Sequence, residues 1–162
     1  MNRDLSVLAA WSRLGYTVFL GVALVFFFQV IHLLSDAGYR TALGPEQVAA
    51  QVMLALQSFD STWLVGLTVF GLHLVIVGVL ILRSGLAPRA LGVLLMVAGV
   101  AYAADTVAHA LLADYAAVAD AFLVAVAVPS MIGEGWLGIW LLLTRRLETD
   151  RTGTPGVEAV DR

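Results

Sequence analysis

The chain has 162 residues, of which 60% are hydrophobic and 13% charged, and its mean hydropathy is +0.92. These values exceed what a water-soluble domain of this size normally buries, so they exclude a soluble fold. The net charge is -3 and no basic patch lies outside the helix flanks, which excludes a nucleic-acid partner. The absence of cysteine excludes disulfides, thiolate metal ligands and thiol catalysis.

Four long apolar runs follow one another, at about residues 14–34, 62–82, 90–112 and 121–143. Each run reaches or exceeds the roughly 20 residues that an α-helix needs to cross ~30 Å of hydrocarbon. The runs lack the alternation of barrel strands, and every backbone amide must be hydrogen-bonded inside lipid. The predicted fold class is therefore all-α, a four-helix transmembrane bundle that forms one integral-membrane domain over residues 1–146.

The arginines predict the orientation of these spans. Arg40 lies between spans one and two, whereas the other basic residues flank the opposite ends: Arg3, Arg13, Arg83, Arg89, Arg145, Arg146, Arg151 and Arg162. By the positive-inside rule, both termini and the turn at 84–88 are cytoplasmic. Residues 35–61 and 113–120 are then expected outside.

Two segments outside the spans have sequence patterns that predict their structure. Gly44-Pro45-Glu46 is typical of a helix start, with proline and an acid in the first turn. It predicts a short outer-side helix between spans one and two. Residues 147–162 are polar and lack periodicity, so we expect a disordered cytoplasmic tail.

Glycines recur every seven residues across spans two and three, at Gly71, Gly78, Gly85, Gly92 and Gly99. Seven residues are nearly two helical turns, so the glycines of each span share one stripe. Small residues let transmembrane backbones approach closely, which predicts a tight antiparallel hairpin. Ordinary glycine enrichment in membrane helices is the alternative interpretation.

Each run also carries polar or ionisable residues that hydrocarbon disfavours, on faces typical of a bundle interior. The candidate ligand-binding or proton-relay residues are His32, His73, Tyr102, Asp105, His109 and Glu134. A rise of about 1.5 Å per residue puts His73 and Glu134 near the bilayer midplane. Asp105 is expected closer to the outer face, and His32 and His109 closest to it. Together they predict a polar track from the outer face to the centre.

A lone carboxylate at the midplane is driven to the neutral form or to a partner, so we expect Glu134 to be protonated or to meet His73. Simpler roles stay open for each residue. A backbone carbonyl is a sufficient partner for His73, and Asp105 can hold His109 through an i,i+4 hydrogen bond. His32 and His109 lie near the outer interface, where histidine costs little.

The order of short motifs along the chain resembles a known family. The motifs include Phe70-Gly71-Leu72-His73-Leu74, Arg83-Ser84-Gly85, Pro88-Arg89-Ala90-Leu91-Gly92, Ala98-Gly99-Val100-Ala101-Tyr102 with Asp105, Gly133-Glu134 and Trp140-Leu141. From about Trp11 to Leu143, the chain resembles the bacterial multi-pass membrane proteins known as domain of unknown function 4386.

This resemblance implies a place in the bacterial cytoplasmic (inner) membrane, and it implies that His73, Asp105 and Glu134 belong to a shared pattern. It implies no particular reaction, substrate or cofactor. Members typically have about six spans, so the chain resembles their C-terminal four. That difference favours a homo-oligomer or pairing with another membrane protein, in addition to contact with the lipid bilayer.

Three functional classes follow. The leading hypothesis is a protein that binds or passes a small ion, proton or polar ligand through an intramembrane pocket. The second is a b-type haem or metal protein, although no spaced ligand motif supports it. Its ligands would be His32 and His109 as an axial pair, or His73, Asp105 and Glu134 around a divalent ion. The third is a non-catalytic assembly subunit.

An intramembrane enzyme ranks last among the functional classes. No nucleophile elbow or metal-hydrolase motif is present, so the sequence predicts no catalytic residue. It predicts no cofactor either.

Overall fold

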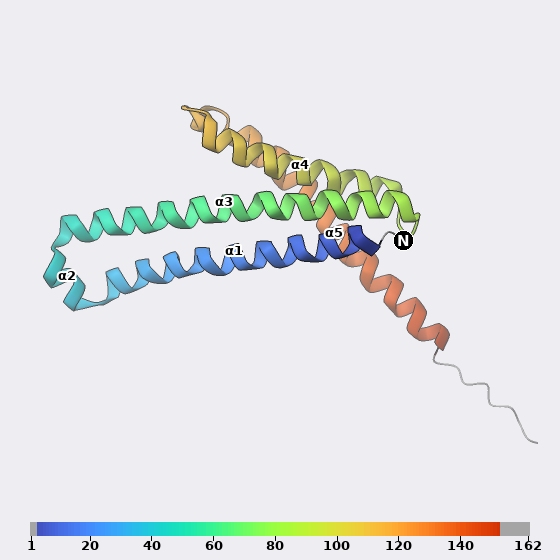
Figure 1. Cartoon of the computed structure of the whole chain (residues 1–162), viewed down its shortest axis with the longest axis horizontal. Helices are drawn as coiled ribbons and strands as arrows, with labels where there is room; N and C mark the ends of the chain where they lie inside the picture. The colour runs from blue at the N-terminus through green and yellow to red at the C-terminus, as the bar shows by residue number, and fades with distance from the viewer. Residues whose placement is uncertain (1–2, 153–162) are drawn as a thin grey trace, which may run out of the picture.

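The chain is folded entirely from helices. A computed structural model describes residues 3–152, with side chains as far as Thr144. The elements are α1 (Arg3–Ser35), α2 (Ala37–Leu43), α3 (Pro45–Ser84), α4 (Arg89–Leu111), the 3-10 turn η1 (Tyr115–Ala117) and α5 (Ala119–Thr152) (Figure 1). No strand occurs in this part of the chain, which confirms the all-α prediction.

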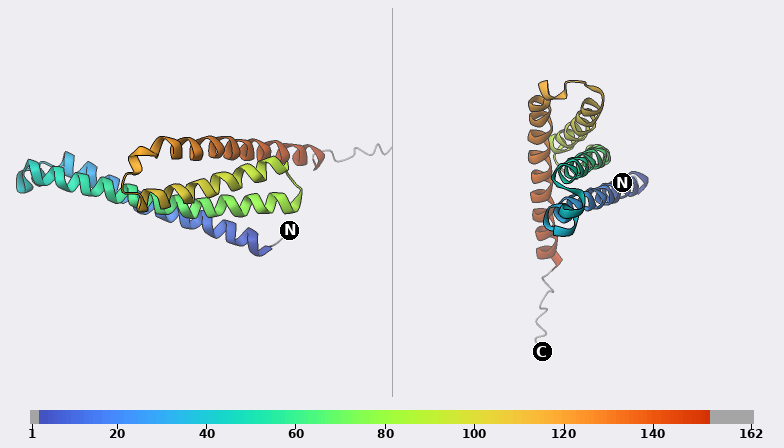
Figure 2. Two further views of the ribbon diagram at one scale, coloured as in Figure 1. Left: turned by 90° about the horizontal axis from the view of Figure 1, so that it is seen from above. Right: turned by 90° about the vertical axis from the view of Figure 1, so that its left-hand side faces the viewer.

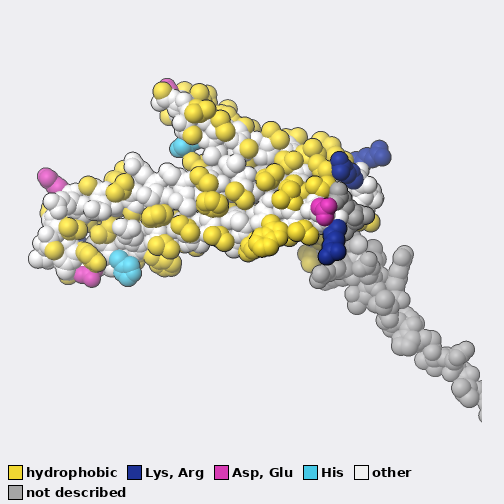
Figure 3. Space-filling view, in the orientation of Figure 1, with side chains coloured by type: hydrophobic (Ala, Val, Ile, Leu, Met, Phe, Trp, Pro, Cys, Tyr) yellow, Lys and Arg dark blue, Asp and Glu magenta, His cyan; other side chains and the backbone are white. Residues whose placement is uncertain are grey.

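Four of these helices, α1, α3, α4 and α5, are long and apolar enough to cross a membrane, which confirms a multi-pass protein. Hydrophobic side chains cover much of their visible surface (Figure 3). In the same view, arginines gather at the end where α3 turns into α4. This is the end that the positive-inside rule predicts to be cytoplasmic. The orientation of the termini stays a prediction.

α1 and α3 run antiparallel, with the short α2 turning between them at one end of the molecule (Figure 1). The turn is fixed by Asp36, whose Oδ1 accepts hydrogen bonds from the backbone N–H of Gly38 at 2.6 Å and of Tyr39 at 3.4 Å. An aspartate at this position satisfies amides that the first helical turn leaves unpaired. A short helix therefore does lie between spans one and two, at α2.

The helix predicted to start at Pro45 begins there but is not a separate element. It continues as α3 for 40 residues, to Ser84, and is about 60 Å long at ~1.5 Å per residue. The polar stretch before span two does not break it. Within this stretch, Ser58 and Thr62 donate their hydroxyls to carbonyls of their own helix, at 2.8 and 2.7 Å.

α3 and α4 form a tight hairpin. Gly85 ends α3 in the left-handed conformation (φ 65°), which glycine adopts without strain. Across the hairpin, a β-carbon on Gly71 would lie 2.5 Å from the carbonyl oxygen of Gly99. One on Gly78 would lie 2.5 Å from that of Gly92. The two backbones thus touch where any side chain would separate them.

The buried core lies along this hairpin and consists of Phe70, Leu74, Ile81, Ala87, Leu91, Leu95 and Ala98. α5 packs on α4 and crosses the other helices at an angle (Figure 2). It continues through Pro129 and on to Thr152, so residues 147–152 are helical where the disordered tail was predicted to begin. The rest of that predicted tail, 153–162, lies outside the described residues.

Candidate functional site

Polar side chains from all four spanning helices interact with one another, and three of them contact the buried ring of Phe70. The interacting residues are Arg13 of α1, His73 of α3, Tyr102 of α4, and Ser130 and Glu134 of α5, and we call them the four-helix polar cluster. They meet because α3 packs on both α1 and α4, and α4 packs on α5. His73, Tyr102 and Glu134 were predicted as site residues.

His73 is tied to the first helix. Its Nδ1 lies 2.9 Å from the backbone carbonyl oxygen of Ala9, and its ring stacks on Phe70 at 5.9 Å between centroids. A carbonyl oxygen only accepts, so Nδ1 carries the hydrogen. In the neutral imidazole this leaves Nε2 as an acceptor for another group.

Arg13 is one of the two cluster residues, with Ser130, that were not among the predicted site residues. Its guanidinium lies over the rings of Tyr16 and Phe70, 5.5 and 4.9 Å from their centroids. It also interacts electrostatically with His73 and Glu134. The sequence suggested a flanking charge, but α1 begins at Arg3 and places Arg13 well inside the helix.

Tyr102 and Ser130 connect α4 to α5. Their hydroxyl groups interact with each other. The Ser130 hydroxyl donates its hydrogen bond to the Ala127 carbonyl, at 3.2 Å. On its other side, the Tyr102 ring meets Phe70 edge-on at 5.5 Å. Ser130 is buried, so this contact lies inside the helix assembly. Tyr102 therefore joins α3 to the polar face of α5.

Glu134 completes the cluster as a half-buried carboxylate. Within the part of the chain whose side chains are described, it forms no hydrogen bond and no salt bridge, and its electrostatic neighbours are Arg13 and Tyr102. The structure does not show the predicted contact with His73, which bonds Ala9 instead. Glu134 is thus a carboxylate in a spanning helix with acceptor capacity to spare.

A second polar group lies at the α4–α5 connection and brings together Asp105, His109 and Tyr115. The Tyr115 hydroxyl donates to Oδ1 of Asp105 at 2.5 Å, and its ring lies 4.5 Å from that of His109. The hydrogen bond to the carboxylate raises the pKa of Tyr115 to about 12. Tyr115 was not among the predicted residues, because nothing in the loop pattern determines how η1 folds back on α4.

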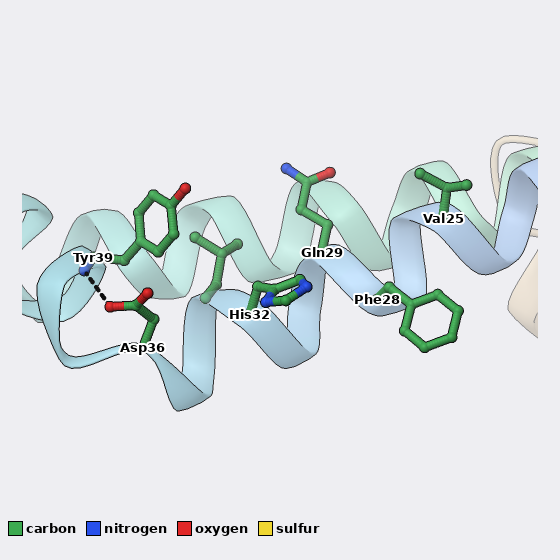
Figure 4. A pocket seen from close by; sticks show the side chains of 7 residues that line it. Val25, Phe28, Gln29, His32, Asp36 and Tyr39 are labelled. Atoms are coloured by element: carbon green, nitrogen blue, oxygen red, sulfur yellow. Dashed lines mark hydrogen bonds between the residues drawn. The ribbon is translucent and has the colours of Figure 1, made fainter.

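His32 lies apart from both groups. It lines a pocket that is formed by the end of α1 and the start of α2, beside Asp36 and Tyr39 (Figure 4). His109 packs instead on Tyr115 of η1. His32 and His109, the two residues predicted to lie closest to the outer face, therefore have different surroundings. Among the side chains that the structure describes, no group of three or more His, Asp or Glu residues is arranged to hold a metal ion.

A protein-family model matches nearly the whole of the described chain. Its description is Domain of unknown function (DUF4386), and the match covers residues 1–144. No curated protein and no solved structure matches the chain. The matched range contains all four spanning helices and both polar groups.

Proposed function

The chain belongs to the DUF4386 family, and from this starting point we propose that it is a bacterial cytoplasmic-membrane protein that binds and passes protons at the four-helix polar cluster. The observation that carries the proposal is Glu134, a carboxylate in a spanning helix without a described hydrogen-bond partner. Ionisable groups are rare in membrane helices, and those retained commonly belong to proton or ion pathways.

The neighbours of Glu134 have the chemistry that a relay needs. Ser130 and Tyr102 carry hydroxyls that can both donate and accept, and the two side chains interact. His73 keeps its Nε2 available, and imidazole exchanges protons near neutral pH. Arg13 is a permanent cation that interacts electrostatically with Glu134.

The second polar group extends the relay along α4. Asp105 lies one helical turn beyond Tyr102, about 4.5 Å along the axis. It accepts the Tyr115 hydroxyl at the end of the helix, beside His109. In the proposed path, protons enter at His109 and Asp105 and reach Glu134 through Tyr102 and Ser130.

Proton flux into proteoliposomes tests this function. Purified protein is reconstituted with a trapped pH-sensitive dye, and a potassium diffusion potential drives proton entry. We expect wild-type flux above that of empty liposomes, and a loss of at least tenfold in Glu134→Gln. Glu46→Gln is the matched control, because Glu46 is an exposed carboxylate in the first turn of α3, away from the cluster.

Two results would contradict the proposal. One is a wild-type protein without flux in either direction of the potential, and the other is equal flux in wild type and Glu134→Gln. A protein without flux that purifies with one membrane partner in a fixed ratio would instead support an assembly subunit. A coloured or metal-containing product would support the haem or metal hypothesis.

A further inference from the structure

A pocket of about 630 Å³ opens where α1 ends, and neither polar group described above contributes to it (Figure 4). Its lining is ordered along the helix. Val25 and Phe28 form one end, and His32, Asp36 and Tyr39 form the other. The pocket thus straddles residue 34, where the first apolar run ends.

This order from apolar to polar suits an amphiphile. From Val25 to His32 the helix rises about 10 Å, enough for several methylene groups. Val25, Phe28 and Leu33 supply apolar surface on this wall, and Gln29 is the polar side chain among them. Phe28 is 60% exposed, so its ring is free to contact a chain. The polar end lies beyond this wall, at the level expected for headgroups.

The polar end carries a negative charge that is held in place. One oxygen of Asp36 accepts two backbone amides, which fixes the carboxylate, and the other has no partner among the described residues. The neighbouring cation Arg40 lines a different hollow, with Leu34 and Pro45. Asp36 thus lines a pocket to which no arginine contributes a side chain.

An aromatic ring stands beside this carboxylate. Tyr39 is 52% exposed and lines the same end of the pocket as Asp36 (Figure 4). A carboxylate next to an aromatic face is the combination that binds ammonium groups, through charge-assisted hydrogen bonds and cation–π attraction.

We propose that this pocket binds a phospholipid whose headgroup carries an ammonium group. The ammonium lies against Asp36 and Tyr39, and an acyl chain lies along Val25 and Phe28. His32, which lies on the Phe28 side of the polar end, can hydrogen-bond the phosphate of the same lipid.

Binding of short-chain lipids to the detergent-purified protein tests the assignment. The probes are dihexanoyl phosphatidylethanolamine, dihexanoyl phosphatidylglycerol and free ethanolamine, measured by thermophoresis. We expect the ethanolamine lipid to bind at least roughly tenfold more tightly than either other probe. Equal binding of the two lipids would overturn the ammonium assignment. Equal binding of free ethanolamine and its lipid would overturn the lipid assignment.

Asp36→Asn separates charge from structure, because asparagine also caps a helix and keeps the turn at α2. We expect this variant to bind the ethanolamine lipid roughly fivefold to tenfold more weakly, with unchanged helicity. Asp60→Asn is the control, since Asp60 is an exposed carboxylate on α3 outside the pocket. Unchanged affinity in Asp36→Asn, or the same loss in Asp60→Asn, would contradict the site.

Discussion

α3 packs against its two neighbours by different means. Against α4 it is backbone on backbone, because Gly71 meets Gly99 and Gly78 meets Gly92. Against α1 it packs through aromatic side chains, as where Tyr16 lies 4.9 Å from the Phe70 ring. At the glycine contacts the first interface leaves no room for side chains, whereas the second is made of side chains.

The difference explains where the polar groups lie. Backbones that touch exclude any side chain from between them, so the glycine contacts can only serve helix packing. The α1–α3 side has space for a ring, a guanidinium and an imidazole around Phe70. The close α3–α4 hairpin thus serves as the support, and the wider faces beside it carry the chemistry.

Gly71→Ala tests this contrast with the largest expected effect. The new methyl would lie 2.5 Å from the Gly99 carbonyl oxygen, so the two backbones must separate. We expect a loss of about 3 kcal/mol in the free energy of unfolding, at the upper end for an overpacked core. The measurement is denaturation in mixed micelles, followed by circular dichroism. Gly135→Ala is the control, because its methyl meets nothing within 4 Å, and alanine there should be neutral or slightly stabilising.

Gly66→Ala makes the same change on the other face of α3. Its methyl would meet the β-carbon of Phe19 at 2.9 Å, a side-chain atom of α1 rather than a backbone oxygen. We expect a smaller loss, about 1–2 kcal/mol, because α1 can shift without opening a backbone contact. The same unfolding titration checks it. A loss equal to or larger than that of Gly71→Ala would remove the proposed difference between the two interfaces.

Most of the fold was predictable because the bilayer restricts the choices. Run length gave the four spans, and the helix start at Pro45 was correct. The continuation of α3 was not predicted, since the helix starting at Pro45 was expected to be short and separate from the apolar run at 62–82. Likewise, the continuation of α5 through residues 147–152 was not predicted, because these residues lack the apolar period that indicates a helix.

The candidate site was only partly predictable, because helical phase gives the face of a residue but not its partner. Phase and depth selected His73, Tyr102 and Glu134, which the structure brings to one cluster. They could not show that His73 bonds Ala9, since that contact depends on the relative axial position of α1 and α3. Arg13 was also missed, because its role depends on how far α1 extends before the apolar run.

Tyr115→Phe tests the outer polar group, with a moderate expected effect. The raised pKa, about 12 against an ordinary 10, means that the folded state favours the neutral phenol. Its stabilising contribution is therefore complete below pH 10 and is lost as the pH rises from 10 to about 12. Partial exposure screens the contact, so we expect a loss of about 0.5–1 kcal/mol at neutral pH.

Phenolate absorbance provides the second measurement on this variant. The difference between wild type and Tyr115→Phe should titrate near pH 12, above the ordinary tyrosine value of 10. Tyr39→Phe is the control, because Tyr39 is exposed on α2 and away from Asp105. A difference titration for Tyr115 centred at pH 10 would show that the hydrogen bond to Asp105 does not hold in solution.

Ser130→Ala is expected to change stability least, and it separates packing from transport. Alanine has nearly the same volume as serine, so the substitution removes only the buried hydroxyl. We expect a loss of about 0.5–1 kcal/mol in the free energy of unfolding. Thr144→Ala is its match on α5, since the Thr144 hydroxyl likewise bonds a carbonyl of its own helix, at 2.9 Å, but lies outside the cluster. If the hydroxyls of Ser130 and Tyr102 carry protons to Glu134, only Ser130→Ala lowers proteoliposome flux severalfold. Equal flux in both variants would leave Ser130 a packing residue and remove it from the proposed path.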